Sequence, residues 1–214
     1  LEMIGSHEVG IIKIVECIYP NANEQFRPSQ KYPEYMFDEI AERENVIYDA
    51  VRKAFIEMKF DKENINTQNW NPLKNIIKPG MTVLVKPNMV MDVNHSGGGT
   101  DCLYTNPSVV APVLDYILKA LKNNGKIIVG DAPVQECNFE QLIKSSGYEQ
   151  LIQFYKNKGI NIELVDFRGV ISSVKGGIYH SEVQPEATGK VINLGKNSEF
   201  YNLEESLKER LRIT

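Results

Sequence analysis

A lysine, an asparagine and an aspartate stand directly after two short apolar runs of this sequence. Lys86 and Asn88 follow residues 83–85, and Asp131 follows residues 126–130. A lysine at such a position can hold a phosphate or carboxylate as a compact point charge, and it can act as a base when it is desolvated. An aspartate can be a base, a metal ligand or an acceptor for sugar hydroxyls. We therefore expect Lys86 and Asp131 to be catalytic; the alternative is an exposed lysine and an aspartate that only stabilise turns.

Further polar side chains are candidates for binding a ligand. Asn88 can both donate and accept hydrogen bonds, so we expect it to orient a ligand, although asparagine also stabilises turns without one. Asp166 and Arg168 follow a third apolar run at residues 160–165. Because they lie two positions apart, their side chains point the same way in an extended chain and can pair. Both are ligand-binding candidates, and a structural salt bridge between them is the stronger interpretation.

A glycine-rich loop between the first two of these apolar runs is a second kind of candidate. His95 precedes Gly97, Gly98 and Gly99, and Thr100 closes the stretch. Backbone N–H groups of such a loop can cradle an anion before a helix, and the histidine can act as an acid, a base or a metal ligand. The stretch matches neither the phosphate-binding pattern G-x-x-x-x-G-K-[ST] nor the dinucleotide pattern G-x-G-x-x-G. The alternative is a surface loop without a ligand.

A strand–helix–strand unit positions these candidates. The run at residues 83–85 predicts a strand, and Asn106 and Pro107 open a helix whose apolar residues recur with helical spacing up to residue 121. Gly125 ends the connection before the next strand at residues 126–130. Such a crossover is nearly always right-handed and makes its two strands parallel. Parallel sheets bind ligands beyond the carboxyl ends of their strands, which is where the lysine and the aspartates stand.

The remaining elements predict an α/β fold built from βαβ units. We expect a mainly parallel sheet with helices on both faces, a β-hairpin extension near the C-terminus, and one domain over residues 9–214 that is incomplete at its C-terminal end. Residues 1–8 are expected to be a disordered or artificial start. The further elements are predicted at these positions: a strand at 9–17, helices within 37–58, 138–145 and 148–157, a strand at 160–165, hairpin strands at 170–174 and 191–194, and a helix at 202–211.

Composition excludes several functional classes. The 214 residues carry a formal net charge of −4 and form no basic cluster with interleaved aromatic residues, which argues against nucleic acid as a partner. No apolar run approaches the roughly 20 residues that span a bilayer, so we expect a cytoplasmic protein without a membrane span. The three cysteines form no C-x-x-C pair, so a zinc site or iron–sulfur cluster has no local signature. No metal site is predicted, and the cofactor stays unknown.

These motifs together resemble the domain of unknown function 362 family. The resemblance rests on Lys86-Pro87-Asn88 after an apolar run, on Thr105-Asn106-Pro107 at the start of a helix, and on residues 129–133 (VGDAP). Phe139, Gly147 and residues 166–168 (DFR) fit a branch of that family associated with sugar gene clusters. Many relatives carry a ferredoxin-like cysteine module, which this sequence lacks. Relatives usually continue beyond the point where this chain stops, so a missing C-terminal half or a protein partner is expected to cover the sheet edge.

The resemblance and the residues leave three functions open. The first is a protein that binds or acts on a small anionic or hydroxylated metabolite, such as a sugar phosphate or carboxylate, at the carboxyl ends of the parallel strands. The second is a non-catalytic ligand-binding or assembly protein of an envelope-polysaccharide pathway. The third, implied by the resemblance alone, is a redox protein that works with an iron–sulfur partner. Because that family has no settled reaction, the sequence does not decide whether the protein is an enzyme.

Overall fold

The computed structural model describes residues 9–16, 18–21, 24–184 and 196. Its centre is the predicted strand–helix–strand unit, formed by β1 (Thr82–Val85), α2 (Pro107–Leu121) and β2 (Lys126–Asp131). The two strands are parallel. Asn106 caps α2, since its side chain accepts a hydrogen bond from the N–H of Ser108 at 3.0 Å.

A second crossover completes the sheet. The chain leaves β2 through α3 (Phe139–Ser146) and α4 (Tyr148–Lys156) and returns as β3 (Ile162–Asp166). This strand pairs in parallel with the free side of β2, which gives the sheet order β1-β2-β3. The α/β class and the parallel sheet are therefore confirmed. The carboxyl ends of all three strands lie at the same edge of the sheet, as expected for parallel strands.

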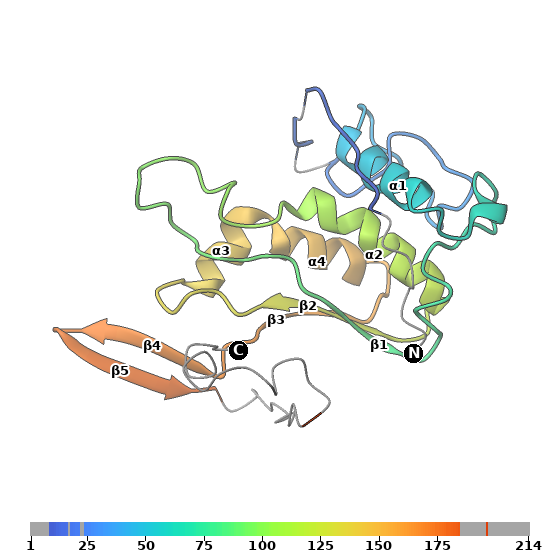
Figure 1. The fold of residues 1–214 in the computed structure, drawn as a ribbon. Coiled ribbons are helices and arrows are strands. Elements are labelled where there is room, and N and C mark those ends of the chain that lie inside the picture. The colour runs from blue at the N-terminus through green and yellow to red at the C-terminus, as the bar shows by residue number, and fades with distance from the viewer. Residues whose placement is uncertain (1–8, 17, 22–23, 185–195, 197–214) are drawn as a thin grey trace.

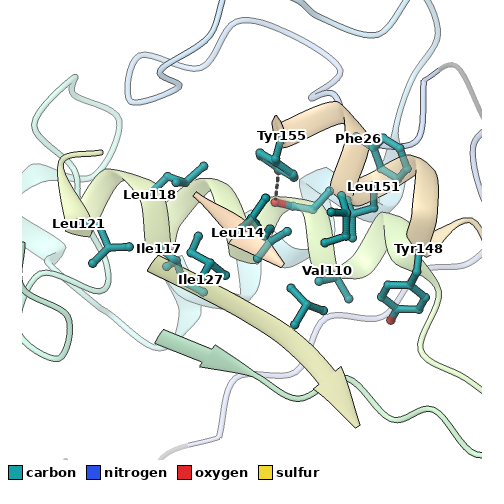
Figure 2. Close-up of a cluster of buried hydrophobic side chains, with 14 of the residues drawn as sticks. Phe26, Val110, Leu114, Ile117, Leu118, Leu121, Ile127, Tyr148, Leu151 and Tyr155 are labelled. Carbon is teal, nitrogen blue, oxygen red and sulfur yellow. Dashed lines mark hydrogen bonds between the residues drawn. The ribbon is translucent and has the colours of Figure 1, made fainter. Parts of the chain in front are cut away.

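The core lies between the sheet and helices α2 and α4. Leu114, Leu118 and Leu121 of α2 and Leu151 of α4 belong to one buried cluster with Ile127 of β2, which Figure 2 shows. The first four residues of β2 alternate between half-buried and buried, because every second side chain points to the helices. The apolar face of α2, predicted from its helical spacing, thus forms one side of the core.

The described helices cover one face of the sheet only, which corrects the expectation of helices on both faces. Helices α2, α3 and α4 lie on the same side of the strands, and α1 (Val46–Glu57) packs on α2 farther from the sheet (Figure 1). On the opposite face, Leu84 is 58% exposed, and Lys126 forms an ion pair with Glu163 at 2.8 Å. Nearly continuous apolar strands suggested two-sided burial, but the apolar residues on the second face are covered by no described helix.

The predicted strand at residues 9–17 is wrong for its described part. Residues 9–16 form no strand; the N–H of Gly10 instead contacts Sδ of Met58, just past α1, at 3.0 Å. Val9 and Ile11 are exposed. The apolar residues favour a strand here, but a strand also needs hydrogen bonds with the backbone of a neighbouring strand. The predicted helix within 37–58 is shorter than its range, because Asn45 caps it immediately before Val46.

A two-stranded hairpin follows the sheet, as expected for the C-terminal extension. β4 (Val170–Lys175) pairs in antiparallel fashion with β5 (Ile178–Val183) through a turn at Gly176 and Gly177, both of which have positive φ. The strand partner predicted at residues 191–194 is therefore corrected to β5. Residues 191–194 and the predicted helix at 202–211 lie outside the described residues.

A buried carboxylate joins α1, α2 and α4. Asp115 of α2 accepts hydrogen bonds from the hydroxyls of Tyr48 at 2.6 Å and Tyr155 at 2.8 Å. Burial raises the pKa of Asp115 to about 7, and the hydrogen bonds from the two tyrosines oppose that rise. The charged form is therefore disfavoured in the folded protein.

This raised pKa predicts a pH-dependent stability. An aspartate in an unfolded chain has a pKa of about 3.9, so the contribution of Asp115 is fully present below about pH 4 and is lost as the pH rises through about 7. Relative to Asp115→Asn, the wild-type protein should lose about 1.4 kcal/mol of unfolding free energy between pH 6 and pH 8. Urea denaturation at both pH values measures this. Asp38→Asn, at an exposed site, is the control that should leave the pH dependence unchanged, and an equal slope in Asp115→Asn would contradict the prediction.

Candidate functional site

The structure brings Lys86 and Asp131 together at the carboxyl edge of the sheet. Nζ of Lys86 lies 2.6 Å from Oδ1 of Asp131, the last residue of β2. The lysine side chain is 58% exposed, whereas the aspartate side chain is only 5% exposed. An exposed ammonium beside a buried carboxylate is therefore present at the predicted place.

The carboxylate of Asp131 also holds the backbone around it. Its Oδ2 accepts a hydrogen bond from the N–H of Met89 at 2.7 Å, and Oδ1 accepts one from the N–H of Ala132 at 2.8 Å. Three donors thus occupy its two oxygens. This side chain ties the segment after β1 to the segment after β2, a structural role that exists whether or not a ligand binds.

Asn88 contributes mainly its backbone to this edge. The N–H of Asn88 donates to Oγ1 of Thr105 at 3.1 Å, and the carbonyl of Asn88 accepts from the N–H of Thr105 at 2.8 Å. Met89 and Tyr104 continue the pairing as an isolated antiparallel bridge. The residue itself is exposed, so its predicted role in orienting a ligand stays a prediction.

Asp166 and Arg168 form the salt bridge that the sequence suggested. Nε of Arg168 lies 3.0 Å from each carboxylate oxygen of Asp166, and Nη2 lies 2.6 Å from Oδ2. Nη1 donates to the carbonyls of Val134 at 3.1 Å and Cys137 at 3.0 Å. The guanidinium is 3% exposed and uses its donors on the protein, so it stabilises the loop after β2.

The glycine-rich loop is not brought to the strand ends. The chain between β1 and α2 extends past α3 before it returns to start α2 (Figure 1). Asn94 closes the loop on itself, because its Nδ2 donates to the carbonyl of Gly99 at 2.7 Å and its Oδ1 accepts from Ser96. His95 and Gly97–Gly99 are exposed, and Thr100 is half-buried. Their binding role has no support from their position in the fold.

A cavity of about 620 Å³ opens beside the Asp166–Arg168 pair. Its walls come from the segment that leads from β2 into α3, from the end of β3 and from the start of β4. The lining residues are Gln135–Glu140, Asp166, Arg168 and Ile171–Ser173. The rule that ligands bind beyond the carboxyl ends of parallel strands anticipated the location. The types of residues 135–140 and 171–173 gave no signal, so sequence reasoning missed them.

The charges that line the cavity are mainly negative. Glu136, Glu140 and Asp166 supply carboxylates, and Glu140 pairs with Lys144 at 2.6 Å. The guanidinium of Arg168 is already bonded to protein oxygens. Cys137 is 4% exposed, and burial raises the pKa of its thiol to about 11. Within the described residues, no group of three or more histidines, cysteines or carboxylates is arranged to hold a metal ion.

Comparison with known proteins finds a matching family model. The model of the domain of unknown function DUF362 matches residues 83–188, which include most of β1, all of β2 and β3, the strand-end residues and the cavity. These residues, about half of the chain, match the DUF362 family. The resemblance carried by residues 86–88, 105–107 and 129–133 is thereby confirmed, and the name of the family attaches no reaction to the site.

A curated relative supports the resemblance to this family. Thylakoid-associated protein sll1697 from Synechocystis sp. is 34% identical over 125 residues, which are 57% of this chain and 35% of that protein. The match thus spans about a third of the length of the curated relative. No solved structure matches the chain. None of the helices in the described part of the chain combines the length and apolar character that crossing a bilayer requires.

Proposed function

We propose that this DUF362 domain binds a small hydroxylated metabolite in the cavity at the carboxyl ends of β2 and β3. The observation that carries the proposal is the cavity itself, which lies at the edge where parallel sheets bind ligands. Its volume of about 620 Å³ falls within the range of roughly 300–1,000 Å³ that is typical of small-molecule sites. Phe139 and Ile171 offer apolar contacts, and the backbone and side chains around them offer polar ones.

The charges favour a hydroxylated ligand over an anionic one. A phosphate or carboxylate is usually held by arginine or lysine donors. Arg168 is the cation in the cavity lining, and its N–H groups already donate to Asp166 and to loop carbonyls. The carboxylates of Glu136 and Asp166 can instead accept hydrogen bonds from hydroxyls. Sugars or polyols without a phosphate therefore fit better than sugar phosphates.

A catalytic role for Lys86 and Asp131 is proposed as an extension of binding. Asp131 and Asp166 are register partners on adjacent strands, which lie about 4.8 Å apart in a sheet. The Lys86–Asp131 pair is thus one strand away from a residue that lines the cavity. The exposed ammonium of Lys86 is the group that could exchange a proton with a bound hydroxyl.

Thermal unfolding with matched ligand pairs tests the binding proposal. The panel contains neutral sugars and polyols, each beside its phosphate ester. A ligand at 100 times its dissociation constant should add about 2.7 kcal/mol, which raises the melting temperature of a domain of this size by about 5–10 °C. We expect such a shift from a neutral compound and a smaller one from its phosphate.

A bulky substitution tests whether the ligand that raises the melting temperature binds in the cavity. Ser173→Trp should fill part of the cavity and abolish the shift. Gln150→Trp, at an exposed position of α4 outside the cavity, is the matched control and should leave the shift unchanged. A shift that survives Ser173→Trp, or a panel in which only phosphates act, would count against the proposed ligand class and site.

A further inference from the structure

The hairpin β4–β5 forms one wall of the cavity, and within the described part of the chain it has little other attachment to the domain. Its residues 171–173 line the cavity opposite the segment 135–140. Among the described residues, no helix or strand outside the hairpin packs broadly against it. Figure 1 shows the two strands projecting from the end of β3, apart from the helices. The hairpin could therefore move without disturbing the core.

One side chain of the domain pairs with β4 as a neighbouring strand would. Nε2 of Gln135 donates to the carbonyl of Val170 at 3.1 Å, and Oε1 of Gln135 accepts from the N–H of Ser172 at 2.9 Å. Residues two apart on an edge strand present their carbonyl and N–H groups on the same side, and a carboxamide offers one donor and one acceptor to match them. The side chain thus takes the place of a strand partner at the open edge of β4.

We propose that the β4–β5 hairpin is a lid over the cavity and that Gln135 is the residue that holds it closed. The inference rests on the proposed function for its biological meaning, because a lid matters only if the cavity takes a ligand. The opening and closing of the hairpin is inferred from the two hydrogen bonds of Gln135 and does not depend on a ligand. Both bonds are exposed to water, and net hydrogen bonds in water are weak, so the lid opens readily and recloses.

Cys137 provides a native reporter of lid opening. Its thiol lines the cavity and is 4% exposed, whereas Cys102 is exposed on the loop before α2. With Cys17 and Cys102 replaced by serine, Cys137 is the single thiol of the three-cysteine chain. The rate at which an aromatic disulfide reagent labels it then measures access to the cavity. No ligand has to be known for this measurement.

The labelling rate of Cys137 in Gln135→Ala tests the lid. Loss of the two hydrogen bonds should shift the lid toward its open form and speed labelling by about tenfold at constant pH. Gln153→Ala is the matched control, because Gln153 of α4 also makes a side-chain hydrogen bond, to Asn157 just after the helix, but does not line the cavity. It should label at the wild-type rate. Equal rates in Gln135→Ala and the wild-type protein would reject the lid.

Hydrogen exchange separates lid opening from general unfolding. In Gln135→Ala, peptides covering β4 and β5 should exchange faster, while peptides from α2 keep their protection. Faster exchange throughout α2 would mean that the substitution destabilises the whole domain. This result would overturn the proposal that Gln135 holds the lid closed.

Ligand protection distinguishes failure of the lid from failure of the proposed function. If a neutral sugar slows the labelling of Cys137 but Gln135→Ala does not change the labelling rate, the binding site is supported and the lid is rejected. Faster labelling in Gln135→Ala with no protecting compound would keep the lid as a mechanical element and count against the proposed ligand.

Discussion

Replacing Arg168 by alanine should lower the free energy of unfolding by about 3–5 kcal/mol. The guanidinium is 3% exposed and holds Asp166 together with the carbonyls of Val134 and Cys137. Its removal leaves a largely buried carboxylate without its charge partner and takes one donor from each of the carbonyls of Val134 and Cys137. Breaking a buried ion pair on one side is costly for this reason, even where the intact pair contributes little net stability.

Urea denaturation monitored by circular dichroism measures this loss. The exposed Arg43→Ala is the matched control and should change stability by less than about 0.5 kcal/mol. Because Arg168 organises the cavity wall, the Arg168→Ala variant should also lose the melting shift produced by a neutral ligand. A variant as stable as the wild-type protein would show that Arg168 is free to serve another purpose, and anion binding would again become the better proposal.

Asp131→Ala should lower the free energy of unfolding by about 3 kcal/mol. The substitution removes the acceptor for the N–H groups of Met89 and Ala132 as well as the partner of Lys86. The N–H of Met89 would be left in a buried position without a replacement acceptor. Asp131→Asn keeps one acceptor oxygen, so its loss of stability should be smaller.

Lys86→Ala is the informative comparison for Asp131. Its ammonium is 58% exposed, and exposed ion pairs contribute at most about 1 kcal/mol. Chemical denaturation of the three variants should therefore rank Asp131→Ala well below Lys86→Ala in stability. If Lys86→Ala lowers the free energy of unfolding as much as Asp131→Ala does, the ion pair provides the stabilisation. The hydrogen bonds from the backbone N–H groups to Asp131 then contribute little. A turnover or ligand shift lost in Lys86→Ala without loss of stability would support the proposed catalytic role of the lysine.

The sequence by itself determined the parts of this protein that depend on local pattern. Apolar runs and the capping residue Asn106 predicted β1, α2 and β2, and the chirality of the crossover made the strands parallel. Lys86 and Asp131 then had to meet, because the carboxyl ends of parallel strands share an edge. The pairing of Asp166 with Arg168 followed from their spacing of two residues.

Contacts between distant segments were decided only by the tertiary structure. Residues 9–16 have a strand-like pattern but no strand partner, and the glycine-rich loop carries suitable groups but extends away from the strand ends. The side of the sheet that the helices cover is also set by packing: nearly continuous apolar strands favour burial on both faces, but the described helices lie on one face only.

The cavity shows most clearly which features the sequence pattern determines and which depend on the tertiary structure. Its location at the strand ends was predictable, whereas its walls join residues 135–140 to residues 171–173, more than 30 positions later in the chain. Gln135 has no special role in its own segment and acquires one because β4 returns beside it. Local periodicity reports which way a side chain points along its own element, while a binding site depends on which other elements fold against it.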